Sequence, residues 1–195
     1  MKAMFTSINK KNIRIIWLCF LVVSIAVYAL YSQYFTKENI VIFLSHYHNQ
    51  ALIIYFIICV LRGITLIPAT PFLFAGIMLF KDTPLLLFIV FMCSILTVST
   101  FLYYASNLVG LGDMFEKIPD QRLLRVKEKL SGTKTFWFIL LWAFTPFTPT
   151  DLVCYAAGAL RIKFLPFIIP LLIGEGVICL FYIFSNYWFG RLFYV

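Results

Sequence analysis

The sequence predicts an all-α membrane protein built as an inverted repeat, with two re-entrant helical hairpins and about three spanning helices. Of its 195 residues, 63% are hydrophobic and 12% are charged, whereas a soluble domain is about half apolar and about a quarter charged. The apolar residues gather in long blocks, and two of these blocks contain paired prolines. No linker rich in Gly, Ser or Pro divides the chain, so we expect one membrane domain over residues 1–195.

Five apolar blocks cover residues 13–35, 51–80, 84–106, 136–160 and 164–189. The first, third and fifth provide the roughly 20 apolar residues that a helix needs to cross a bilayer. The first block follows Lys10, Lys11 and Arg14 and precedes no small-x-small cleavage site. Because it is also longer than the apolar region of a usual signal peptide, we expect a retained anchor.

The second and fourth blocks each carry two prolines three positions apart, namely Pro68 and Pro71, then Pro146 and Pro149. Each proline removes a backbone donor and disfavours helical angles in the residue before it. Interrupted backbone at membrane depth is tolerated only where protein or a water-filled cavity covers it. Threonines near both interruptions can bond the freed backbone groups. We therefore predict hairpins over residues 51–80 and 136–160, each entering and leaving on the same side.

Basic residues distinguish these hairpins from five full spans. Apart from Arg62, 12 basic residues lie in the N-terminal segment, the polar stretch 107–134 and the turn with Arg161 and Lys163, against three elsewhere. Hairpins place all 12 on one side, which the positive-inside rule assigns to the cytoplasm together with the N-terminus. Five full spans would place the six basic residues of the polar stretch outside. Hairpins that enter from opposite faces are typical of an inverted repeat.

Three ionisable residues lie inside apolar blocks: Arg62, Asp151 and Glu175. A charge at the bilayer centre costs at least about 2.5–3.5 kcal/mol, so such residues usually face the protein interior and pair. We expect them to line a midplane cavity, where Arg62 contacts an anionic head group because a guanidinium suits phosphate. Asp151 or Glu175 would carry a proton or balance Arg62. The alternative is a purely structural ion pair, and Asp151 could also cap the second half-helix.

Other functional classes lack support in the sequence. No Walker loop, HExxH or GxSxG motif occurs, so we do not expect an enzyme. No cluster of Asp and Glu suggests a metal, and we predict neither a metal site nor a cofactor. The net charge is +8. Because the basic residues that cause it flank apolar segments, we expect no nucleic-acid partner. Residues 113–130 fit either a basic amphipathic helix on the inner leaflet or a solvated connector.

Residues 145–162 read TPFTPTDLVCYAAGALRI. This stretch resembles the second conserved hairpin of the SNARE-associated Golgi protein family, the VTT-domain or DedA superfamily. Members often read P-F-x-P-x-D-L-V-x-Y-A-A-G-x-x-R-I there. In the first hairpin, Arg62, Pro68, Pro71 and Gly76 match the family pattern loosely. The resemblance covers residues 60–185, which we take as a VTT-like core.

The resemblance implies two oppositely oriented re-entrant hairpins and the transport or scrambling of lipids, often discussed as proton-linked. In bacterial members the lipids include undecaprenyl phosphate. By this resemblance, Asp151, Gly158 and Arg161 of this chain occupy motif positions of the family, together with Arg62 and the four prolines. This chain departs from many members at Ala143, where they have Arg, and at Lys81, where they have Gly.

The predicted site residues form two groups. Those expected to bind substrate are Arg62, Asp151, Glu175 and Arg161, and those expected to mark the hairpin breaks are Pro68, Pro71, Pro146, Pro149 and Gly158. We expect a flippase or scramblase for a phospholipid or polyprenyl phosphate, and the alternative is a non-transporting scaffold that binds lipid or partner proteins. Membrane lipid, including anionic lipid, and a second copy of the chain are the expected partners. Small size and a composition rich in Lys, Ile and Phe favour the plasma (inner) membrane of a bacterium.

Overall fold

The computed structural model of the chain describes residues 10–47, 50–108, 133–145 and 150–193, and every regular element in these ranges is helical. The elements are α1 (Lys10–Tyr31), the 3-10 turn η1 (Ser32–Tyr34), α2 (Lys37–Ser45), α3 (Ala51–Ile64), α4 (Thr70–Leu79), α5 (Pro84–Leu108), α8 (Thr133–Ala143), α9 (Thr150–Ala159) and α10 (Phe164–Phe193). This confirms the predicted all-α class.

Three stretches of the described chain are long and apolar enough to cross a bilayer, as predicted. They are Ile15–Tyr34, Pro84–Ser106 and Phe164–Ser185. By contrast, α3, α4, α8 and α9 contain 14, 10, 11 and 10 residues. At 1.5 Å per residue these four helices are about 15–21 Å long, whereas the hydrocarbon core is about 30 Å thick. Each short helix can reach the middle of a bilayer but cannot span it.

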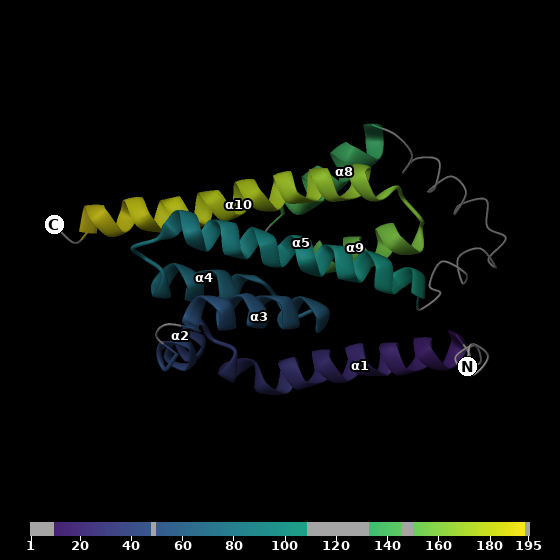
Figure 1. Ribbon diagram of the computed structural model, residues 1–195, viewed down its shortest axis with the longest axis horizontal. Coiled ribbons are helices and arrows are strands. Elements are labelled where there is room, and N and C mark those ends of the chain that lie inside the picture. The colour runs from purple at the N-terminus through teal and green to yellow at the C-terminus, as the bar shows by residue number, and fades with distance from the viewer. Residues whose placement is uncertain (1–9, 48–49, 109–132, 146–149, 194–195) are drawn as a thin grey trace.

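The short helices form two pairs that fold back on themselves. Figure 1 shows that α3 begins and α4 ends near the start of α5, whereas α8 begins and α9 ends at the opposite end of the molecule. Pro68 lies in the first interruption, and Pro71 lies in the first turn of α4. Pro146 and Pro149 lie outside the described residues, as does the polar stretch 113–130. That these pairs re-enter a bilayer stays a prediction.

The first interruption begins with a well-formed helix cap. The Ile67 N–H donates to the Arg62 carbonyl at 3.0 Å and the Leu66 N–H to the Gly63 carbonyl at 3.2 Å. Leu66 has a φ of 59°, the left-handed angle that this type of cap requires. The Thr65 hydroxyl donates to the Arg62 carbonyl at 2.9 Å. The Arg62 and Gly63 carbonyls near the end of α3 are therefore satisfied although the helix stops inside an apolar segment.

A threonine also bonds the helix end at the second interruption. The Thr145 hydroxyl, just after α8, donates to the Leu141 carbonyl at 3.0 Å. Thr65 makes the equivalent bond to the Leu61 carbonyl at 3.2 Å. The expectation that threonine hydroxyls bond freed backbone groups is confirmed at these two positions.

The order short, short, long occurs twice, as α3–α4–α5 and α8–α9–α10, and the two long helices run in opposite directions (Figure 1). The hydrophobic core divides in the same way. One cluster joins α3 and α4 to the first half of α5, and the other joins α8 and α9 to its second half. The α10 helix contributes to both clusters. This arrangement agrees with the predicted inverted repeat.

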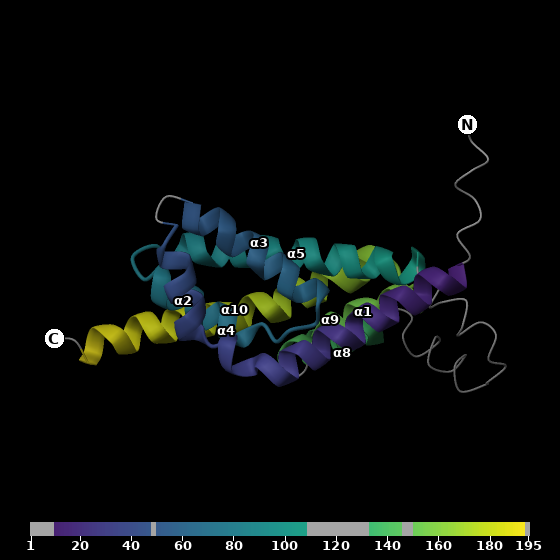
Figure 2. The same ribbon diagram turned by 90° about the horizontal axis from the view of Figure 1, so that it is seen from below.

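The α1 helix lies along one side of the bundle (Figures 1 and 2). No residue of its apolar span is buried. It touches the second hairpin through Trp17, whose indole N–H donates to the Tyr155 hydroxyl at 3.1 Å. A helix so exposed and so apolar is suited to lipid on most of its surface, which agrees with an anchor.

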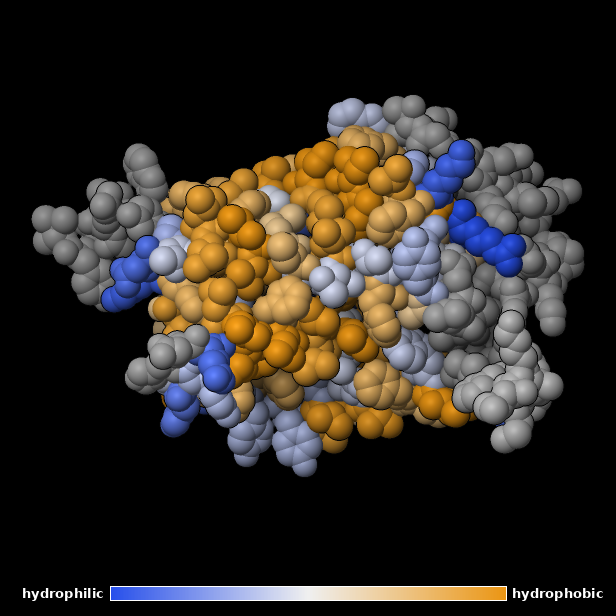
Figure 3. Space-filling view, viewed as in Figure 1, coloured by the Kyte–Doolittle hydropathy of each residue, from blue (hydrophilic) through white to orange (hydrophobic). Residues whose placement is uncertain are grey.

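The surface supports lipid as the surrounding solvent. Figure 3 shows apolar side chains over the middle of this face and strongly hydrophilic ones towards the ends. The starts of α1 and α8, the end of α5 and the turn between α9 and α10 lie at one end of the molecule, and the link between α4 and α5 lies at the other (Figure 1). This matches the predicted grouping of basic segments. Which end faces the cytoplasm stays a prediction.

Candidate functional site: a cavity between the two hairpins

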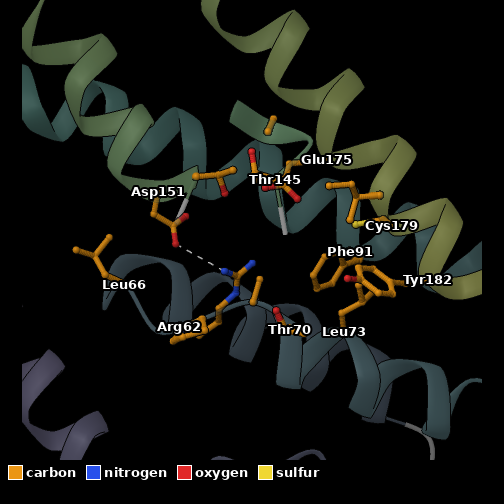
Figure 4. Close-up of a pocket in the computed structure, with 15 residues that line it drawn as sticks. Arg62, Leu66, Thr70, Leu73, Phe91, Thr145, Asp151, Glu175, Cys179 and Tyr182 are labelled. Atoms are coloured by element: carbon orange, nitrogen blue, oxygen red, sulfur yellow. Dashed lines mark ion pairs between the residues drawn. The ribbon is translucent and has the colours of Figure 1, made fainter. Parts of the chain in front are cut away.

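A cavity of about 280 Å³ lies where the two hairpins meet α5 and α10. Figure 4 shows the side chains around it. The polar ones are Arg62, Thr70, Thr145, Thr150, Asp151, Glu175, Cys179 and Tyr182. The apolar ones include Leu66, Pro68, Ala69, Leu73, Phe91, Ala143 and Ile178. Both interruptions therefore border the cavity, as expected for broken backbone that must be sheltered from lipid.

Arg62 is the cation of the cavity. It lies in the last turn of α3 and is only 6% exposed. Its Nη1 lies 3.7 Å from Asp151 Oδ2, which is an ion pair longer than a hydrogen bond. Its Cζ lies 5.9 Å from the centre of the Phe91 ring. The Nε has no hydrogen-bond partner among the described residues, which is rare for a buried polar group.

Asp151 reaches the cavity from the other hairpin. It lies in the first turn of α9 and is 9% exposed. There its carboxylate is near the positive end of the helix dipole, which favours a negative charge. Figure 4 shows the side chain pointing towards Arg62 across the space between α3 and α9. Thr150 is the first helical residue, so Asp151 lies inside the first turn and not at the N-cap position that the predicted capping role requires.

Glu175 reaches the cavity from α10, on the same side as Thr145 in Figure 4. Its neighbour Gly174 lies so close to α8 that an added Cβ would meet Ala143. The glycine lets α10 approach α8 closely, as expected for a small residue at a helix contact. A Cβ at Gly176 would make only ordinary contacts, the nearest at 3.5 Å from Met92. One cation and two carboxylates, each from a different helix, thus share one cavity.

The other predicted site residues lie elsewhere. Arg161 follows α9 and does not line the cavity. Gly158 lies inside α9 and not at an interruption. There the Tyr103 carbonyl and the Ser106 hydroxyl of α5 occupy the space that a side chain would need. Its role in this structure is the close approach of α9 to α5.

Sequence reasoning missed three residues that line the cavity, Phe91, Cys179 and Tyr182. Each is one apolar or weakly polar residue in a long apolar helix, where the pattern does not separate a cavity-facing position from a lipid-facing one. Within the described part of the chain, no three His, Cys, Asp or Glu side chains are grouped to hold a metal ion.

A comparison with protein families matches the VTT domain over residues 67–192, more than half of the chain. The match includes α4, α5, α8 and α9, and it begins just after Arg62. Comparisons with curated proteins and with solved structures give no significant match. The VTT domain is the one that the motif at residues 145–162 resembles. The chain therefore belongs to the VTT-domain family of integral membrane proteins, the SNARE-associated or DedA family.

Proposed function

We propose that this protein moves an anionic lipid, a phospholipid or a polyprenyl phosphate, between the leaflets of its membrane. The observation that supports this most directly is Arg62. It is a buried cation that borders a cavity, and among the described residues it has an ion pair at 3.7 Å but no hydrogen-bond partner for its Nε. A purely structural arginine would have its donors satisfied. A phosphate can accept several of them at once, because a guanidinium presents its N–H groups as a planar fork.

The position of the cavity suits the passage of a head group. Four half-length helices meet there, so polar side chains lie at a depth where an exposed head group would otherwise meet hydrocarbon. The volume of about 280 Å³ is at the lower limit of the roughly 300–1,000 Å³ typical of ligand pockets. The cavity therefore fits a head group, while the acyl or prenyl chains stay in the bilayer.

The carboxylates provide a link to protons. A phosphate that binds Arg62 competes with Asp151, which lies 3.7 Å from the guanidinium. A buried carboxylate that loses its cation is costly to keep charged, so it takes up a proton instead. Release of the phosphate restores the ion pair and the proton leaves. Glu175 lines the same cavity and can exchange protons in the same way.

The test is lipid flipping in proteoliposomes that contain acyl-labelled fluorescent phosphatidylglycerol, with an impermeant quencher outside. We expect wild-type protein to move labelled lipid from the inner to the outer leaflet, where the quencher reaches the label. Arg62→Ala and Asp151→Asn slow this by about tenfold or more, because a hydrogen bond to a charged group contributes about 1.5–3 kcal/mol. Lys81→Gln, an exposed change outside the cavity, keeps the wild-type rate. Equal rates for Arg62→Ala and wild type would contradict the proposal. Folded wild-type protein without any flipping would favour the scaffold alternative.

A further inference from the structure

A second hollow lies between α8 and α9, and it shares no lining residue with the cavity. It is a groove of about 230 Å³ with an almost wholly apolar lining. Its floor is formed by Ile139, Val153 and Ala157, which are 1%, 8% and 1% exposed. Its sides are formed by Phe138 and Leu152, which are 48% and 49% exposed. The groove therefore opens onto the surface of the bundle and offers no polar partner to a head group.

One end of the groove carries positive charge. Leu160 and Ile162 line this end, and the exposed Arg161 and Lys163 alternate with them along the chain. Figure 3 shows hydrophilic side chains gathered at the end of the molecule where α9 passes into α10 in Figure 1. Apolar surface thus passes directly into a cationic rim.

The rim is held firmly in place. The Ile162 N–H donates to the Ala157 carbonyl at 3.0 Å, and the Tyr103 hydroxyl of α5 donates to the Ile162 carbonyl at 2.6 Å. Arg161 has a φ of 54°, so α9 ends in the same left-handed cap that ends α3. A turn fixed by these bonds presents its two cations without first having to be ordered, which favours binding.

The length of the groove matches the depth of one leaflet. Its lining extends from Leu152 in α9 to Leu160 just after that helix, a rise of about 12 Å at 1.5 Å per residue. Half of the hydrocarbon core is about 15 Å thick. A lipid whose phosphate lies at the rim can therefore place one acyl chain along the whole groove.

We propose that the groove and its rim bind one anionic phospholipid of the surrounding leaflet. Its acyl chain lies between α8 and α9, and its phosphate lies at Arg161 and Lys163. A zwitterionic lipid offers the same chain but gains less from two cations, because its own ammonium group opposes them. The site shares no lining residue with the cavity. The lipid acts as a structural ligand of the second hairpin, and this role does not depend on transport.

The test uses the full chain in detergent with added phosphatidylglycerol or phosphatidylcholine. Native mass spectrometry counts retained lipid, and thermal unfolding measures stabilisation. Wild-type protein retains one phosphatidylglycerol and gains about 5 °C in Tm at saturating lipid, since a ligand that binds only the folded state stabilises it. The double variant Arg161→Gln with Lys163→Gln removes the phosphate contacts. Ala156→Phe fills the groove from an exposed position. Both variants lose the retained lipid and the shift.

A control variant locates the bound lipid. Lys37→Gln with Lys81→Gln removes two exposed cations outside the groove and keeps the wild-type shift. Loss of the shift in this control would assign the lipid to exposed positive charge in general and overturn the proposal. An equal response to phosphatidylcholine would also overturn the proposal, and so would an undiminished response in Ala156→Phe. A dimer that retains no lipid would overturn it as well.

Discussion

At the scale of single residues, the energetics of this protein depend most on Arg62 and Asp151. Both are nearly buried, at 6% and 9% exposure, and the two side chains come from hairpins almost 90 positions apart in the chain. A buried ion pair is weak evidence for stability, because desolvation offsets the attraction between its charges. Removing one partner of such a pair is costly, since the other charge is then left uncompensated. The two residues should therefore be strongly coupled.

We predict this coupling for the variants Arg62→Met and Asp151→Asn. Each single change lowers the free energy of unfolding, and the double change costs less than the sum by about 1–3 kcal/mol. The measurement is denaturant unfolding in detergent for wild type, both single variants and the double variant. Losses that simply add would show that the ion pair contributes nothing.

The chain supplies a matched control for this cycle. Lys37 and Glu38 form an ion pair at the same 3.7 Å, but their side chains are 48% and 57% exposed. Water screens such a pair, so its coupling energy is at most about 1 kcal/mol. The cycle Lys37→Met with Glu38→Gln should therefore come out close to additive. Equal coupling in the two cycles would contradict the assigned burial of Arg62 and Asp151.

At the scale of elements, each hairpin is held together and held against the long helices by close contacts. Within the first hairpin, the fully buried Tyr55 of α3 donates its hydroxyl to the Phe72 carbonyl of α4 at 3.1 Å. The same hydroxyl occupies the space beside Gly76. In the second hairpin, Gly158 lets α9 lie against the backbone of α5. The half-length helices therefore depend on tertiary packing and not on their own length for stability.

We predict opposite effects for alanine at two glycines. A Cβ at Gly158 would overlap the Tyr103 carbonyl, which belongs to a helix backbone and cannot move aside easily. Gly158→Ala should cost about 1–3 kcal/mol of stability, as overpacking does. Gly176→Ala should be neutral or stabilising by up to about 1 kcal/mol, because the space is free and alanine restricts the unfolded chain.

The measurement for both glycine variants is the Tm in detergent together with the yield of monodisperse protein on size exclusion. A Gly158→Ala variant as stable as wild type would contradict the close approach of α9 to α5. A severe loss in Gly176→Ala would contradict the open space at that position.

At the scale of the whole molecule, the charged segments are sorted to the two ends by the hairpins. The link between α4 and α5, which carries Lys81, lies at the end opposite the α9–α10 turn, which carries Lys163 (Figure 1). Five full spans would instead place Lys81 and Lys163 on the same side, because two membrane crossings, residues 84–106 and 136–160, would lie between them.

We predict that Lys81→Cys and Lys163→Cys react with an impermeant maleimide from opposite sides of the membrane. The measurement compares labelling of intact and permeabilised cells or oriented vesicles. Lys37→Cys serves as a control and should label from the same side as Lys81→Cys, because a hairpin between them returns the chain to its starting side. Labelling of positions 81 and 163 from the same side would contradict the second hairpin, and labelling of positions 37 and 81 from opposite sides would contradict the first.

The sequence alone determined the features that depend on local chain chemistry. Paired prolines separated the two interrupted apolar blocks from the three that span, and they located the interruption between α3 and α4, because two prolines three positions apart each remove a backbone donor and disfavour helical angles in the residue before them. The cost of burying a charge also marked Arg62, Asp151 and Glu175 as residues that turn inward. All three line the cavity.

Only the tertiary structure decided which residues meet. Arg161 carries a motif position and a charge, yet it lies outside the cavity, and Gly158 lies inside α9 as a packing residue. Phe91 and Tyr182 line the cavity although nothing in the sequence distinguishes them from lipid-facing aromatics. The physical reason is that a contact between α3, α9 and α10 depends on how remote helices pack together. Local rules of sequence fix where a helix begins and ends, but not which of its faces meets a partner.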